Sequence, residues 1–196
     1  MPIQNVAPPI QQLSEAKVGE PMFFVVSIRK LLILSLLTFN GYWLFCYWRS
    51  WVFYRRSSGE KIWPALRAAG GFLFLYGLNR RIDQQIRLSG RTYRWSPFLI
   101  ALAAPLALAA QIWLSLLASS KPEWSWLPIA VVGLGLCWTV RLQQAINFCV
   151  GDPAGESNSR FTWANGIWMA CGALSWLAYL AAIILPGAVS MSIPSS

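Results

Sequence analysis

The stretch PFLIALAAPLALAAQIWLSLLA, residues 97–118, contains no charged side chain. An α-helix of about 20 apolar residues is long enough to cross the hydrocarbon core of a bilayer. The stretch therefore predicts a membrane-spanning helix, and the proline at its centre, Pro105, is expected to kink that helix. Because the apolar residues are continuous and do not alternate with polar ones, the stretch is typical of a helix and not of a membrane strand.

Four further apolar stretches lie on either side of this segment. They cover residues 22–48, 62–78, 124–140 and 163–185. The last of them is also uncharged throughout, whereas 62–78 is the weakest candidate because only its part 68–78 is free of charge. We therefore predict an all-α fold, a polytopic membrane helical bundle with about five transmembrane helices.

The overall composition agrees with a membrane protein. Hydrophobic residues make up 56% of the 196 residues and charged residues only 12%, with a mean hydropathy of +0.47. A soluble domain carries about 25% charged residues, so this composition excludes an ordinary soluble enzyme, a disordered chain and a coiled coil. Residues 1–21 lack the apolar core of a signal peptide and are predicted to be a disordered tail. We expect the membrane helical domain at 22–186 and a short C-terminal tail at 187–196.

The charges predict the orientation. The chain has 16 Lys and Arg against 7 acids, a net charge of +9, and membrane proteins keep basic residues on the cytoplasmic side. With five spans and a cytoplasmic N-terminus, ten basic residues lie inside and five outside. If residues 31–78 instead form a hairpin that returns without crossing, the ratio becomes fourteen to one. The length of the first apolar stretch favours five spans, which is our prediction. The distribution of basic residues favours the alternative of three spans plus an N-terminal re-entrant or interfacial hairpin.

Aromatic residues recur at helical spacing within the first apolar region. Positions i, i+4, i+8 and i+11 share one face of a helix, and they are occupied here by Trp43, Tyr47, Trp51 and Tyr54. Arg55 and Arg56 follow directly. Amphipathic rings prefer the headgroup level of a membrane, and arginine both pairs with phosphate and lies over ring faces. The pattern predicts an aromatic girdle that fixes a helix end, or a site for a lipid headgroup or a partner.

A second basic segment lies in the expected cytoplasmic linker 79–96. Its five arginines are Arg80, Arg81, Arg87, Arg91 and Arg94. Each cation close to an anionic leaflet contributes roughly 1 kcal/mol of attraction, so the segment is interpreted as an anchor and as a candidate site for anionic lipid. It contains no nucleic-acid recognition motif, and no nucleic-acid partner is expected.

Residues that carry chemistry are scarce. The chain has no histidine, and all seven acids lie outside the apolar stretches, so it offers neither a histidine-activated nucleophile nor an intramembrane carboxylate. The four cysteines do not have metal-ligand spacing. We predict no catalytic residue, no cofactor and no metal site.

The predicted function is that of a non-catalytic membrane protein whose basic cytoplasmic face contacts anionic lipids, a membrane-protein partner or a second copy of itself. The alternative is a small solute transporter or channel component. Transport would require polar side chains to converge on a cavity near the midplane of the membrane. The candidates are Asn40, Arg67, Gln111 and Asn165.

Several short patterns resemble one protein group. They are Thr-Phe-Asn-Gly-Tyr-Trp at 38–43, Tyr47-Trp48, Gln143 with Asn147, and Gly-Asp-Pro-Ala-Gly at 151–155. Together they resemble a group of uncharacterised bacterial inner-membrane proteins in which a Thr-Phe-Gly-x-Tyr-Trp pattern ends the first apolar segment, and the resemblance covers most of residues 23–180. It implies a multi-pass helical protein of the bacterial inner (cytoplasmic) membrane and brings no established activity with it.

Overall fold

All regular secondary structure in the described residues is helical. The computed structural model describes residues 21–121, 124 and 126–191, and its regular elements there are seven α-helices and a short 3-10 helix. The prediction of an all-α fold is confirmed. The predicted disordered tail at 1–21 lies outside the described residues except for Pro21.

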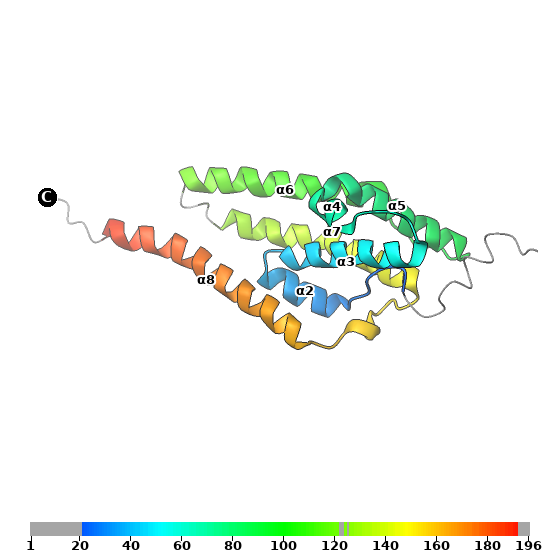
Figure 1. Cartoon of the computed structure of the whole chain (residues 1–196). Coiled ribbons are helices and arrows are strands. Elements are labelled where there is room, and N and C mark those ends of the chain that lie inside the picture. The colour runs from blue at the N-terminus through cyan, green and yellow to red at the C-terminus, as the bar shows by residue number, and fades with distance from the viewer. Residues whose placement is uncertain (1–20, 122–123, 125, 192–196) are drawn as a thin grey trace, which may run out of the picture.

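Two long antiparallel helices, α6 (Pro97–Ser120) and α7 (Leu127–Val150), pack side by side along the bundle (Figure 1). The Ser96 side chain caps α6 by accepting a hydrogen bond from the backbone N–H of Leu99 at 3.3 Å, and α6 continues through Pro105. Among the described residues, α6 is the one helix long and apolar enough to cross a membrane, and only 6% of its apolar window is buried within the protein. An apolar surface of this extent is typical of helices that contact a membrane or another protein.

The first apolar stretch folds as two helices, so the predicted continuous helix across 22–48 is wrong. Helix α2 (Ile28–Leu37) ends at a reversal over 38–40, and α3 (Gly41–Ser58) runs back beside it. Ten residues of α2 rise only about 15 Å, half the thickness of a bilayer core. The reversal uses positive φ angles at Phe39 (49°) and Asn40 (68°). Asparagine adopts this conformation more often than most other residues with a side chain, whereas phenylalanine rarely does.

The second apolar stretch is also broken. Helix α4 (Pro64–Ala69) starts with the proline in its first turn, where its missing N–H costs no hydrogen bond, and ends at Gly70. The chain then reverses into α5 (Phe72–Leu88) through Gly71, whose φ of 46° and ψ of −116° suit only glycine. Because α5 extends to Leu88, half of the predicted linker 79–96 is helical.

The last helix, α8 (Trp163–Met191), follows the short 3-10 helix η2 (Glu156–Asn158) and packs across α2. The contact is close at Gly172, where an added Cβ would lie 2.4 Å from the carbonyl oxygen of Leu37. The indole N–H of Trp176 donates to the carbonyl of Leu36 at 3.1 Å, which satisfies one of the open carbonyls at the end of α2. Helix α8 reaches Met191, so it extends beyond the predicted end at Pro186 into the predicted C-terminal tail, although a proline removes one backbone hydrogen bond from a helix.

Candidate functional site

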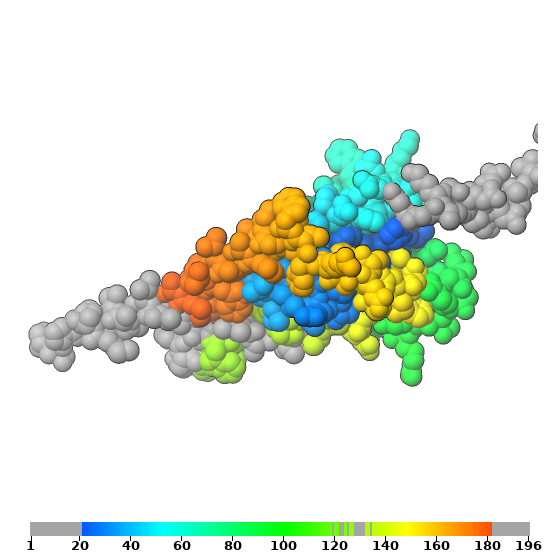
Figure 2. All heavy atoms as spheres, turned by 90° about the horizontal axis from the view of Figure 1, so that it is seen from below, coloured from blue at the N-terminus to red at the C-terminus, as the bar shows by residue number. Residues whose placement is uncertain are grey.

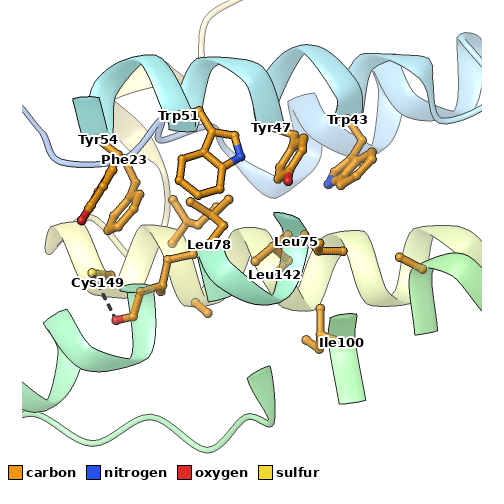
Figure 3. Packing of buried hydrophobic residues seen from close by; sticks show 14 of the residues in the cluster. Phe23, Trp43, Tyr47, Trp51, Tyr54, Leu75, Leu78, Ile100, Leu142 and Cys149 are labelled. Atoms are coloured by element: carbon orange, nitrogen blue, oxygen red, sulfur yellow. Dashed lines mark hydrogen bonds between the residues drawn. The ribbon is translucent and has the colours of Figure 1, made fainter. Parts of the chain in front are cut away.

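The aromatic stripe of α3 forms the centre of the hydrophobic core. Trp43, Tyr47, Trp51 and Tyr54 are exposed by 6%, 1%, 0% and 8%. They point from α3 toward the apolar side chains of α5 and α7 (Figure 3). The helical spacing predicted their common face correctly, but both predicted roles needed rings at the surface. In this fold the stripe is interior packing.

Two arginines and one carboxylate lie around Trp51 and Tyr54, the last two residues of this stripe. The guanidinium of Arg67 lies 4.4 Å from the ring centroid of Trp51, and that of Arg81 lies 5.6 Å from it. Arg81 also pairs with Glu60 at 3.2 Å, and Glu60 accepts a hydrogen bond from the hydroxyl of Tyr54. These contacts lower the pKa of Glu60, chiefly through the Tyr54 hydrogen bond. The cluster links α3, α4 and α5: its one carboxylate pairs with Arg81, and Arg67 is held over the ring of Trp51.

Arg91 holds the end of α7. Its guanidinium donates to the carbonyl oxygens of Phe148 at 2.9 Å and Cys149 at 2.7 Å, and it lies over the Phe148 ring. The last carbonyls of a helix lack partners within the helix and carry its negative dipole end, so a cation there is stabilising. Arg91 therefore has a structural role, which the sequence did not distinguish from that of its neighbours.

The remaining predicted arginines are more accessible. Arg87 pairs with Asp83 at 2.8 Å, and the other oxygen of Asp83 accepts from the Trp95 indole at 3.1 Å. The other four are exposed and, within the described part of the chain, form no side-chain hydrogen bond or ion pair: Arg55, Arg56, Arg80 and Arg94. We refer to these four as the free arginines. They belong to the end of α3, to α5 and to the segment that leads into α6.

Amide side chains of α7 bind an extended segment near the N-terminus. Asn147 donates to the carbonyl of Val26 at 2.9 Å and accepts from its N–H at 3.4 Å. Gln143 donates to the carbonyl of Phe24 at 3.0 Å and to Asn147 at 2.8 Å. We call Gln143 and Asn147 the amide clamp. Spacing of i and i+4 on an apolar helix signalled paired polar residues, but the sequence did not show that their partner is backbone.

The segment around η2, residues 152–160, completes this attachment. Lys30, only 2% exposed, donates to the side-chain oxygen of Asn158 at 2.7 Å and to the carbonyl of Arg160 at 2.8 Å. Gly155 approaches the same segment so closely that an added Cβ would lie 2.7 Å from the backbone of Ser27. The carboxylate of Asp152 accepts from the backbone N–H groups of Ser157 and Glu156 at 2.9 Å each, which lowers its pKa.

A cavity of about 290 Å³ lies where the two hairpin reversals meet α6 and α7. Asn40 and Gln111 both line it, so two of the four transport candidates converge. The rest of its lining is glycine, aliphatic or aromatic, including Trp43, Phe72 and Trp138. The Asn40 amide donates to the hydroxyl of Thr139 at 3.3 Å. The cavity therefore suits an apolar occupant better than a hydrated solute.

The other two transport candidates lie elsewhere. Arg67 is stacked on Trp51, and Asn165 is buried at the start of α8, where its side chain accepts from the N–H and hydroxyl of Thr162 at 2.9 and 3.1 Å. Both have structural partners. The polar set expected of a carrier is thus divided among three regions.

No protein family, curated protein or solved structure matches the chain. Membership of the bacterial inner-membrane group that the sequence resembles stays a prediction.

Proposed function

We propose that this is a non-catalytic integral membrane protein whose basic cytoplasmic end binds anionic lipid headgroups. One observation carries the proposal: the free arginines are exposed and, within the described residues, form no ion pair, whereas three carboxylates of the described chain are engaged. Glu60 and Asp83 pair with Arg81 and Arg87, and Asp152 accepts backbone hydrogen bonds. Arginine binds phosphate through two parallel hydrogen bonds, which a lysine cannot form. Engaged acids are also poorly placed to act as catalytic acids or bases.

The proposed arrangement in the membrane has α6, α7 and α8 as spans, with the α2–α3 and α4–α5 hairpins entering from the cytoplasmic side and returning to it. Support comes from the reversals at 38–40 and 70–71 and from the length of α2. The arrangement places fourteen basic residues of the sequence inside and only Lys121 outside, apart from Arg67 within α4. Five spans would place Arg55, Arg56 and Lys61 outside.

Labelling a cysteine at Ser58 distinguishes the two arrangements. Ser58 ends α3, and the re-entrant arrangement predicts that Ser58→Cys reacts with a membrane-impermeant maleimide only after the cytoplasmic side is opened. The background should have the four native cysteines replaced, and Ser120→Cys at the end of α6 and Ser157→Cys in η2 serve as outside and inside references. Labelling of Ser58→Cys in intact cells would establish a crossing by the first apolar stretch.

Removing the charges of the free arginines should weaken lipid binding. Arg55, Arg56, Arg80 and Arg94 changed together to glutamine lose up to about 4 kcal/mol of attraction to an anionic leaflet, at about 1 kcal/mol for each cation. We expect several-fold less phosphatidylglycerol retained on the protein in native mass spectrometry from nanodiscs of mixed phosphatidylglycerol and phosphatidylcholine. Arg91 stays unchanged because it caps α7.

The matched control changes the same four arginines to lysine. The lysine variant keeps the charge and loses the planar guanidinium, so its retention reports how much of the binding depends on charge alone. High salt should reduce the difference between wild type and the glutamine variant, because exposed charges are screened. Equal phosphatidylglycerol retention by wild type and the glutamine variant would refute the proposal.

A carrier for a small, largely apolar solute is the second candidate function. It is favoured by the cavity at the hairpin reversals, because Asn40 and Gln111 both line it. Half-helices that meet inside a membrane are also found around the substrate sites of transporters. Uptake of a labelled solute into liposomes that is abolished by Gln111→Leu would favour this function over lipid binding.

A further inference from the structure

An open groove of about 560 Å³ runs along α7 beside α2, outside every site described above. Figure 2 views the molecule from the side of α8 and shows the blue atoms of α2 between the orange atoms of α8 and the lime-to-yellow atoms of α7. The residues that line the groove are Leu32, Gly133, Leu136, Cys137, Val140, Arg141 and Gln144.

The polar groups of this groove gather at one of its ends. Arg141 is exposed and, within the described residues, has no carboxylate or hydrogen-bond partner. One turn further along α7, the side-chain oxygen of Gln144 is buried and also lacks a partner. A buried polar group without a partner is costly. The pair therefore offers an unused guanidinium and an unused amide side by side.

The remainder of the groove is apolar and leads away from the basic end. Gly133, Cys137 and Arg141 follow one another at i, i+4 and i+8, so they form a single stripe on α7. The rise from Arg141 back to Gly133 is about 12 Å. Leu32 of α2 and Leu136 form the side walls of this part. Read from the basic end, the groove presents the amide of Gln144, then the guanidinium of Arg141 and then apolar surface as far as Gly133.

We propose that this groove binds one anionic phospholipid, with its phosphate on Arg141 and an acyl chain lying toward Gly133. The order of charge and apolar surface matches a lipid inserted from the cytoplasmic leaflet, and the guanidinium complements the phosphate. A headgroup hydroxyl such as that of phosphatidylglycerol would supply the donor that the Gln144 oxygen lacks. The inference rests on the proposed lipid-binding function but assigns a single, structured site that is separate from the free arginines.

Two variants test the two ends of the groove in the full chain. Arg141→Gln removes the cation, and we expect about fivefold weaker retention of a single phosphatidylglycerol in native mass spectrometry, the effect of about 1 kcal/mol. Gly133→Leu fills the apolar end without altering charge. An added Cβ at Gly133 meets no atom within 4 Å, so this variant is expected to fold and to displace the acyl chain.

Matched controls use the same substitutions outside the groove. Arg94→Gln removes an exposed arginine of the basic end, and Gly166→Leu adds a leucine to α8 where a Cβ also meets nothing within 4 Å. Both should keep the tightly retained lipid. Phosphatidylcholine as the sole lipid should give no such single retained molecule.

The outcomes separate this site from the general proposal. Unchanged retention in both Arg141→Gln and Gly133→Leu would overturn the groove site, even if the free arginines still enrich anionic lipid. Suppose that the single lipid is lost in these variants while the variant with glutamine at the four free arginines retains lipid as wild type does. This outcome would support the groove site and contradict lipid binding by the free arginines. A dimer that forms in wild type and disappears in Gly133→Leu would show that a second copy of the chain occupies the groove, which also contradicts the proposal.

Discussion

Changing Asn147 to leucine is expected to lower the free energy of unfolding by about 3 kcal/mol. Leucine has nearly the same size as asparagine, so the change removes hydrogen bonds without opening a large cavity. It leaves the N–H and carbonyl of Val26 and the amide of Gln143 without their partner, in a site where Asn147 is fully buried. Each such group costs about 1–3 kcal/mol when buried and unpaired.

The measurement is denaturation of the detergent-solubilised protein in mixed micelles, followed by tryptophan fluorescence. Gln84→Leu is the control, because Gln84 is an exposed amide on α5 without a side-chain hydrogen bond in the described residues. The control should unfold as wild type does. If Asn147→Leu also unfolds as wild type does, the amide clamp does not hold the N-terminal segment.

Changing Gly155 to alanine should have a similarly large effect, about 3 kcal/mol. Gly155 has a φ of 70°, where alanine is strained by about 1–2 kcal/mol. The new Cβ would also lie 2.7 Å from backbone atoms of Val26 and Ser27, which cannot move aside like a flexible side chain. Overpacking of this kind typically costs 1–3 kcal/mol more.

Gly90→Ala separates the two causes. Gly90 has nearly the same φ, 69°, but an added Cβ there meets no atom within 4 Å. The same unfolding measurement should give about 1 kcal/mol of destabilisation for Gly90→Ala, from backbone strain alone. Equal effects at the two glycines would mean that the loop at 151–155 does not press against residues 26–27.

The apolar stretches predicted correctly which residues are helical, but they did not predict where the chain reverses between two helices. Residues 97–118 gave a helix with nearly the observed bounds because nothing interrupts them. Residues 22–48 are also mostly apolar, yet they turn back at Phe39 and Asn40. Hydrophobicity shows that a segment avoids water but not where the chain turns back. The one turn signal at this reversal is the dipeptide Asn40-Gly41, which stands inside an otherwise apolar stretch.

The same limit applies to the candidate site. Helical spacing placed Trp43, Tyr47, Trp51 and Tyr54 on one face, but their burial depends on α5 and α7, which come later in the chain. The five arginines of 79–96 were equivalent in sequence. Their separate roles follow from tertiary neighbours: Arg91 reaches the end of α7, and Arg81 reaches Glu60. Local patterns cannot predict contacts between segments so far apart.

The amide clamp joins positions 121 residues apart in the chain. A ribosome that adds 5–20 residues per second needs about 6–24 s to synthesise that interval. During this time the segment that contains Phe24 and Val26 has no α7 to bind. This segment therefore reaches its final hydrogen bonds only after α7 has been synthesised, so the part of the described fold that is made first is among the last to be completed.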